Sequence, residues 1–223
     1  MMIFTLAVVD ENQILLGRIT GDDIHDVVEE RATEQIYHMA GVNDEAEQDE
    51  EFWSIGKTRA IWLAINLITA IAASIVIGMF DATIEAIVAL AVLMPIVASM
   101  GGNAGTQTLT VTVRKIALGE IEGKEAFVTV KREVLLALFN GLIFSIVIGT
   151  VAFLWFKIPL LGVVIALSMV INLFFAGFFG TLIPLGLRKA GIDPAIGSTV
   201  ILTTVTDVVG FFSFLGLATL ILL

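Results

Sequence analysis

The sequence contains no cysteine and only two histidines, His25 and His38, among its 223 residues. Without cysteine the chain forms no disulfide and offers no thiolate for catalysis or metal binding. Basic residues are also scarce, because 12 Lys and Arg stand against 22 Asp and Glu and give a net charge of −10. This acidic balance argues against nucleic acid as a partner.

Apolar residues, in contrast, are in excess. They make up 57% of the chain, and the mean hydropathy is +0.98, far above that of a soluble domain of this length. The charge is divided unevenly: residues 1–56 hold fourteen acids and two bases, whereas residues 57–223 hold eight acids and ten bases. The composition therefore predicts an acidic soluble segment joined to a nearly neutral domain in the lipid bilayer.

Apolar runs of bilayer-spanning length predict an all-α membrane protein with five transmembrane helices. The expected spans are 58–80, 84–113, 133–156, 159–187 and 195–223. Three parts follow from this pattern: a small ββα segment at 1–42, an acidic linker with the start of a connecting helix at 43–57, and a five-helix transmembrane domain at 58–223.

The basic residues predict the orientation in the cell membrane. With five crossings, nine of the ten bases after residue 56 fall on the side of the N-terminal segment, and only Lys157 falls on the other. Because basic loops stay in the cytoplasm, we expect a cytoplasmic N-terminus and an external C-terminus.

The N-terminal segment reads as two short strands in "TLAVVDENQILLGRIT", turned at Asp10–Asn12, followed by a helix over about 22–39. "ILLGRITGDD" resembles the closing strand and helix start of a CBS module. That resemblance implies that Thr20 and Asp23 contact the phosphate and ribose of an adenine nucleotide. The alternative is a solvated helix N-terminus with acids placed favourably at its positive end.

An acidic run lies between this segment and the first span. Clustered carboxylates usually mark a solvated linker, and they also suit loose binding of a divalent cation such as Mg²⁺. The run comprises Asp44, Glu45, Glu47, Asp49, Glu50 and Glu51.

The second span carries a polar stripe in "PIVASMGGNAGTQTLTVTVR". Its polar residues recur every three or four positions and therefore share one helix face, and they are Ser99, Asn103, Gln107 and Thr110. We expect this face to line a wet path. Gly101 and Gly102 fit either helix packing or exposure of backbone carbonyls to the same path.

The fifth span offers a matching face, because Thr199, Thr203 and Asp207 recur every four residues. A carboxylate inside a span costs about 2.5–3.5 kcal/mol on insertion scales, so Asp207 should be paired, hydrated or functional. One carboxylate among hydroxyls and amides suits hydrated Mg²⁺, which keeps its waters. The lack of nearby His or Cys disfavours zinc and copper.

"PIVASMGGNAGTQTLTVTVR" and "GIDPAIGSTVILTTVTDVVGF" together resemble the MgtE family of magnesium channels. The resemblance implies a homodimer whose pore lies between the second and fifth spans of both subunits and is closed by cytoplasmic Mg²⁺. By position, Asp207 matches the aspartate that holds hydrated Mg²⁺, and Asn103 matches the asparagine beside it. Ser99 and Thr203 match residues whose oxygens line that metal site. Residues 53–59 match a plug helix at the cytoplasmic pore mouth.

Three alternatives remain open at this point. The first is an ion-coupled secondary transporter of divalent cations, since an intramembrane Asp can relay protons. The second is an intramembrane aspartyl protease, which would need a second carboxylate beside Asp207. The third is a membrane scaffold that uses its polar stripes only for helix association. We expect the protein not to be an enzyme, because only Asp207 lies deep within a span and a single chain cannot assemble the carboxylate pair.

Overall fold

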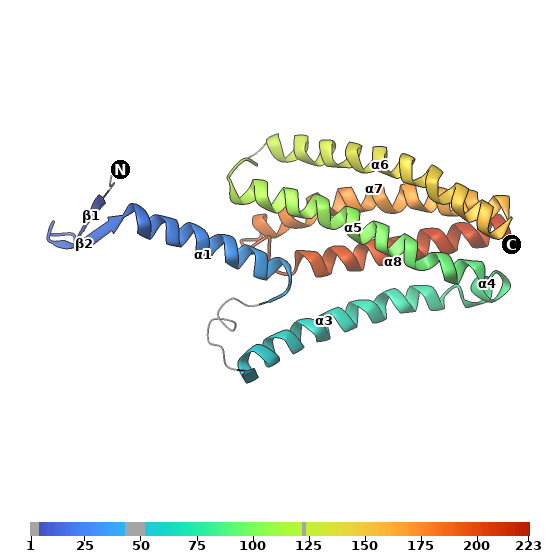
Figure 1. Ribbon diagram of the computed structural model, residues 1–223, viewed down its shortest axis with the longest axis horizontal. Helices are drawn as coiled ribbons and strands as arrows, with labels where there is room; N and C mark the ends of the chain where they lie inside the picture. Colours follow the sequence, from blue (N-terminus) through green and yellow to red (C-terminus); the bar gives the residue numbers. More distant parts are fainter. Residues whose placement is uncertain (1–4, 43–51, 122–123) are drawn as a thin grey trace. The chain divides into compact units, whose positions relative to one another are not determined.

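A computed structural model describes residues 5–42, 52–121 and 124–223 of the chain (Figure 1). The chain divides into two units, Met1–Arg59 and Ala60–Leu223, which are considered separately. In chain order the elements are β1 (Thr5–Val9), β2 (Leu15–Thr20), α1 (Gly21–Met39), α3 (Phe52–Gly78), α4 (Asp81–Ala86), α5 (Ala89–Ala117), α6 (Lys124–Phe156), α7 (Pro159–Lys189) and α8 (Ser198–Leu222).

The N-terminal unit is the expected hairpin and helix. β1 and β2 pair antiparallel from Thr5↔Thr20, with an irregularity after Val8. The Asp10 carboxylate accepts hydrogen bonds from the backbone N–H groups of Asn12 and Ile14, at 2.9 and 2.7 Å, and so forms the predicted turn. No described residue of these strands or of α1 is buried, as expected for a two-stranded hairpin and one helix that are too small to form a core.

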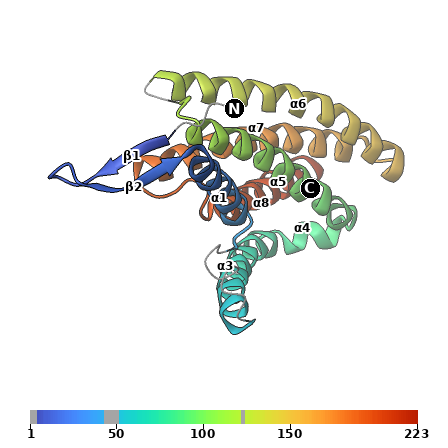
Figure 2. The same ribbon diagram turned by 60° about the vertical axis from the view of Figure 1, so that its left-hand side comes forward.

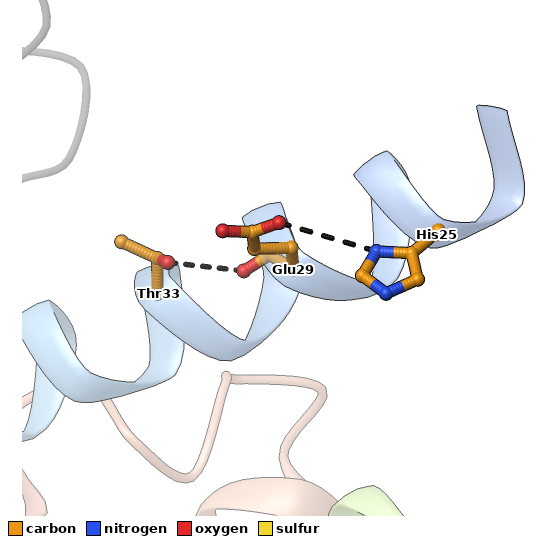
Figure 3. A network of polar contacts seen from close by, with 3 residues as sticks. All are labelled: His25, Glu29 and Thr33. Carbon is orange, nitrogen blue, oxygen red and sulfur yellow. Dashed lines mark hydrogen bonds and ion pairs between the residues drawn. The ribbon is translucent and has the colours of Figure 1, made fainter. Parts of the chain in front are cut away.

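Contacts along α1 are those of a helix in water (Figure 3). The His25 ring lies 4.0 Å from the Glu29 carboxylate one turn on, and the Thr33 hydroxyl donates to the Glu29 carbonyl at 3.0 Å. The His25 and Glu29 side chains are 80% and 75% exposed, so this pair adds little stability. His25 is therefore a surface residue.

Five helices among the described residues are long and apolar enough to cross a bilayer, namely α3, α5, α6, α7 and α8. The prediction of an all-α membrane protein with five spans is thus confirmed. Three of the predicted starts were wrong. The helix of the first span begins at Phe52 and not at 58. The second span begins at Ala89 and not at 84, because residues 81–86 form the separate short helix α4, which ends where Ile87 leaves helical geometry. The helix of the third span begins at Lys124 and not at 133.

α7 is the central helix of the membrane domain, and Figures 1 and 2 show α5, α6, α7 and α8 running side by side. Within the most apolar windows, 56% of α7 is buried but only 6% of α3. Glycines allow the closest contacts: Gly149 of α6 and Gly162 of α7 face each other, and Gly180 of α7 lies against the Gly105 carbonyl of α5.

One end of this bundle holds the apolar core, and the other holds most of the basic residues. The core is built from Leu90, Leu93, Val97, Ala152, Leu161, Val164, Ile165, Phe214, Leu215 and Ala218. At the opposite end Arg114 and Lys115 close α5, and Arg188 and Lys189 close α7. The Arg188 guanidinium donates to the Ile121 carbonyl at 2.7 Å, which ties the loop after α5 to the end of α7.

Candidate functional site

The polar stripe of α5 lies on the exposed face of the helix. Ser99, Asn103, Gln107 and Thr110 are all exposed, whereas Gly101, Gly105 and Leu109 are buried. The Asn103 amide donates to the Ser99 hydroxyl at 3.3 Å, so the structure brings these two predicted residues together. Within a single chain the stripe therefore faces outward, toward whatever surrounds the bundle.

The two glycines beside the stripe have different surroundings. Gly101 is buried against the Asn172 carboxamide of α7, where a Cβ would overlap that side chain. It therefore serves helix packing, the first of the two roles that the sequence left open. Gly102 is half-buried, and a Cβ there would meet no atom within 4 Å.

On α8, Thr199, Thr203 and Asp207 are half-buried. The Thr203 hydroxyl donates to the Val200 carbonyl of its own helix at 3.1 Å. Across residues 5–42, 52–121 and 124–223, no side chain or backbone group forms a hydrogen bond or ion pair with the Asp207 carboxylate. A half-buried intramembrane carboxylate without a protein partner needs water or a cation to compensate its charge.

Two contacts between α5 and α8 show where Asp207 lies along the length of α5. Gly105 lies against the Leu202 side chain, and Gly210 lies against Val97, so the helices run antiparallel with 97–105 opposite 210–202. Asp207 falls inside this interval on α8, and the Ser99–Asn103 turn falls inside it on α5. The carboxylate and the hydrogen-bonded pair therefore lie at similar depth along the bundle.

A cavity of about 390 Å³ opens beside the stripe, between α5, α6 and α7. Carboxamides from two helices meet there, because Asn140 of α6 joins Asn103 and Gln107 of α5. The full lining is Met100, Asn103, Ala104, Thr106, Gln107, Asn140, Phe144 and Leu173. Asp207 does not line it.

Asn140 was not among the residues predicted from the sequence. The signal was available, since "LLALFNGLIF" places one carboxamide in the middle of an otherwise apolar span. A single Asn in a span more often bonds across helices than lines a path, and only the folded structure places it in one cavity with Asn103 and Gln107.

The available ligands are thus neutral oxygens and one carboxylate. Among the described residues, no three His, Cys, Asp or Glu side chains gather where they could hold a metal ion. Hydroxyl and carboxamide oxygens suit the water shell of a hard cation better than direct coordination of a transition metal. The arrangement can therefore accept a hydrated cation near Asp207.

The Thr20–Asp23 motif forms a capping box at the start of α1. The Asp23 carboxylate accepts from the Thr20 backbone N–H at 2.6 Å, and the Asp23 N–H donates to the Thr20 hydroxyl oxygen at 3.4 Å. These contacts fit the helix N-terminus alternative, and nucleotide binding by the motif stays a prediction. The acidic run from Asp44 to Glu51 lies outside the described residues.

The chain is similar to known proteins over most of its length. The sequence model of the MgtE family, described as a divalent cation transporter, matches residues 94–217, which include both polar stripes and Asn140. Magnesium transporter MgtE of Bacillus subtilis (strain 168) is 34% identical over 214 residues, which are 96% of this chain and 48% of that protein.

Two further relatives carry the same name. Magnesium transporter MgtE of Thermus thermophilus is 34% identical over 220 residues, 97% of this chain and 48% of that protein. The one from Enterococcus faecalis is 30% identical over 213 residues, 96% of this chain and 47% of that protein. The chain thus spans about half the length of the curated relatives it matches. It belongs to the MgtE family of divalent cation transporters, which are not enzymes.

Proposed function

We propose that this chain forms the membrane part of a Mg²⁺ channel that passes the hydrated ion between two copies of α5 and two copies of α8. The observation that carries the proposal is the Asp207 carboxylate, which has no partner among the described residues and lies level with Ser99 and Asn103. Family membership supports cation transport, and it removes the aspartyl protease from consideration.

A hydrated ion fits this site better than a bare one. Mg²⁺ demands octahedral coordination and dehydrates reluctantly, so it usually keeps several waters and contacts few carboxylates. Asp207 supplies the negative charge, while Asn103, Ser99 and Thr203 supply oxygens for its waters. Mg²⁺ in particular, among hard cations, is supported by the names of the three relatives.

The exposure of the α5 stripe supports a homodimer. Four polar side chains in a row on the outer face of a span are costly in lipid, so the face needs a protein partner or water. A second copy around a two-fold axis would bring stripe to stripe and Asp207 to Asp207, which gives the pore two charges. Gln107 and Thr199 would extend this lining toward the end of the bundle where Arg114 and Lys115 lie.

We propose that the N-terminal segment and the acidic run regulate Mg²⁺ flux from the cytoplasmic side. The basic residues at the ends of α5 and α7 support a cytoplasmic location for that side of the bundle. We propose that Mg²⁺ binding to the acidic run at 44–51 closes the pore. Deleting residues 1–50 should then keep Mg²⁺ flux and raise it at high internal Mg²⁺. A correctly inserted deletion variant without any flux would contradict this role.

The deciding experiment is Mg²⁺ flux into liposomes that contain the purified chain, measured with and without an imposed pH gradient. A channel predicts flux driven by the Mg²⁺ gradient alone. Flux that requires the proton gradient would favour the ion-coupled transporter. No metal-dependent flux in either condition would support the scaffold and refute the proposed function.

A further inference from the structure

Asn172, in the middle of α7, is completely buried where α5, α7 and α8 meet. Its amide nitrogen donates to the Val97 carbonyl of α5 at 2.8 Å. Its carboxamide lies directly against Gly101 of α5, and it lies against Gly210 of α8, where a Cβ would come within 2.8 Å of the same amide nitrogen. One side chain therefore separates the backbones of the two helices that carry the candidate pore residues.

The other atom of this carboxamide is unsatisfied. In the described part of the chain, Asn172 Oδ1 is the buried side-chain atom that has no hydrogen-bond partner. The amide orientation follows from the Val97 carbonyl, which can accept a hydrogen bond but cannot donate one. An orphaned buried acceptor lowers stability, so an apolar residue of similar shape would suit the fold at least as well.

The position of Asn172 suggests what offsets that cost. Gly101 lies between Ser99 and Asn103 in the sequence and faces the opposite side of α5. Gly210 lies one turn from Asp207 on α8. Any change in the carboxamide would shift the α5 backbone behind the stripe relative to the α8 backbone beside the carboxylate.

We infer that Asn172 is a positioning residue for ion transport, which sets the spacing between the Ser99–Asn103 turn and Asp207. The inference rests on the proposed function of that site. Its hydrogen bond to the Val97 carbonyl fixes the height of α5, and its contacts with Gly101 and Gly210 fix the separation of α5 and α8. Asn172 itself touches no ion.

The test compares Mg²⁺ dependence with stability in the full chain reconstituted into liposomes. Asn172→Leu keeps the branched shape and removes both polar atoms, and Asn172→Ala removes the contacts altogether. The matched control is Ser168→Ala, because Ser168 is also completely buried on α7 but donates only within its own helix, to the Ile165 carbonyl at 3.0 Å.

We expect Asn172→Leu to raise the half-saturating Mg²⁺ concentration by about ten-fold or more, because small displacements of binding groups weaken a site strongly. Its thermal midpoint in detergent should stay at or above that of the parent chain. Asn172→Ala should shift the Mg²⁺ dependence in the same direction with a lower midpoint, and Ser168→Ala should match the parent. Partial misfolding alone would lower the maximal rate and leave the half-saturating concentration unchanged.

Two results would overturn the inference. In the first, the parent transports Mg²⁺ and Asn172→Leu matches its half-saturating concentration and maximal rate. In the second, neither Asn172 variant folds, which would make the residue a requirement of folding. Absence of Mg²⁺ flux in the parent chain would instead refute the proposed function, so the two failures are distinguishable.

Discussion

The Asn103 amide donates a hydrogen bond to the hydroxyl oxygen of Ser99, 3.3 Å away and one helical turn earlier on the exposed face of α5. This bond orients the carboxamide, and its oxygen can then accept a hydrogen bond from a water molecule of the ion's shell. The pair gives α5 a neutral, water-binding surface at the depth of Asp207.

Asn103→Leu should therefore reduce Mg²⁺ flux without unfolding the bundle. Loss of one water-mediated contact predicts a partial effect, about two- to ten-fold. Flux in liposomes is the measurement, and the elution volume in size-exclusion chromatography checks assembly.

The direction of the stripe can be tested separately with cysteines at 103 and at the apolar, exposed position 92. Reaction of water-soluble thiol reagents at 92 but not at 103 would mean that the helix faces the other way.

Asp207→Asn should reduce Mg²⁺ flux by about ten-fold or more, since charged clefts concentrate counter-ions to that extent. In a two-fold pore the change removes two charges at once, while the shape and one water-binding oxygen remain. Asp207→Glu should do less harm because it keeps the charge. Ser213→Ala on the same helix is the control, as its hydroxyl donates to the Gly210 carbonyl within α8. Parental flux in a correctly assembled Asn variant would refute the pore assignment.

Asn140→Leu should lower Mg²⁺ flux by about two- to ten-fold if the carboxamide-lined cavity belongs to the ion path. The matched control is Thr150→Val, because Thr150 is also exposed on α6 and its hydroxyl donates to the Ile146 carbonyl of its own helix. Equal flux in the two variants would mean that the cavity is not part of the ion path. Thiol reactivity of a cysteine at 140 measures whether water reaches it.

Gly162→Ala should destabilise the membrane domain by about 1–3 kcal/mol, because that is the typical loss of stability when an extra methyl group is forced into a packed interior. A Cβ at 162 would lie 2.6 Å from the Gly149 carbonyl oxygen, so α6 and α7 would have to move apart. Gly186→Ala on the same helix meets no atom within 4 Å and should be neutral or stabilise by up to about 1 kcal/mol. Thermal unfolding in detergent compares the two variants, and equal midpoints would contradict the close helix contact.

Acid should loosen the start of α1. The hydrogen bond from the Thr20 backbone N–H lowers the pKa of Asp23 below its ordinary value of 3.8. Because the folded pKa lies below the unfolded one, the stabilisation is complete above the ordinary value and is lost as pH falls through the folded pKa. Carbon chemical shifts of residues 20–24 report the change. Asp23→Ala should produce it at neutral pH, and Asp22→Ala should not.

The sequence predicted the number of spans and the faces of α5 and α8 because both depend on local periodicity. Apolar runs of bilayer length and polar residues every three or four positions need no knowledge of neighbouring helices. The same reasoning predicted the turn at Asp10 and the helix that follows the second strand. The starts at 58, 84 and 133 were wrong, since the first and third helices continue through charged residues at their N-terminal ends and apolar composition continues through α4.

The tertiary contacts could not be predicted from the sequence. Asn172 and Asn140 read as isolated carboxamides in apolar spans, and nothing in their local pattern says that one contacts two glycines and the other lines a cavity. Gly101 was equally ambiguous until its partner on α7 was known. Asp207 could be identified from the sequence because a carboxylate raises the free energy of membrane insertion anywhere in a span. The role of a neutral amide depends instead on which helix lies beside it.

The unequal burial of α3 and α7 has a consequence for biogenesis. α3 leaves the ribosome before the other spans, and its apolar surface is already matched to lipid, so it can enter the bilayer without waiting for a partner. α7 carries Ser168, Asn172 and Thr181 into the bilayer interior, and the Asn172 amide acquires its acceptor only from Val97 of a span made earlier. Translocation of α7 should therefore be delayed at the insertion machinery until α5 is held nearby, which makes the order of span release part of how this membrane domain is assembled.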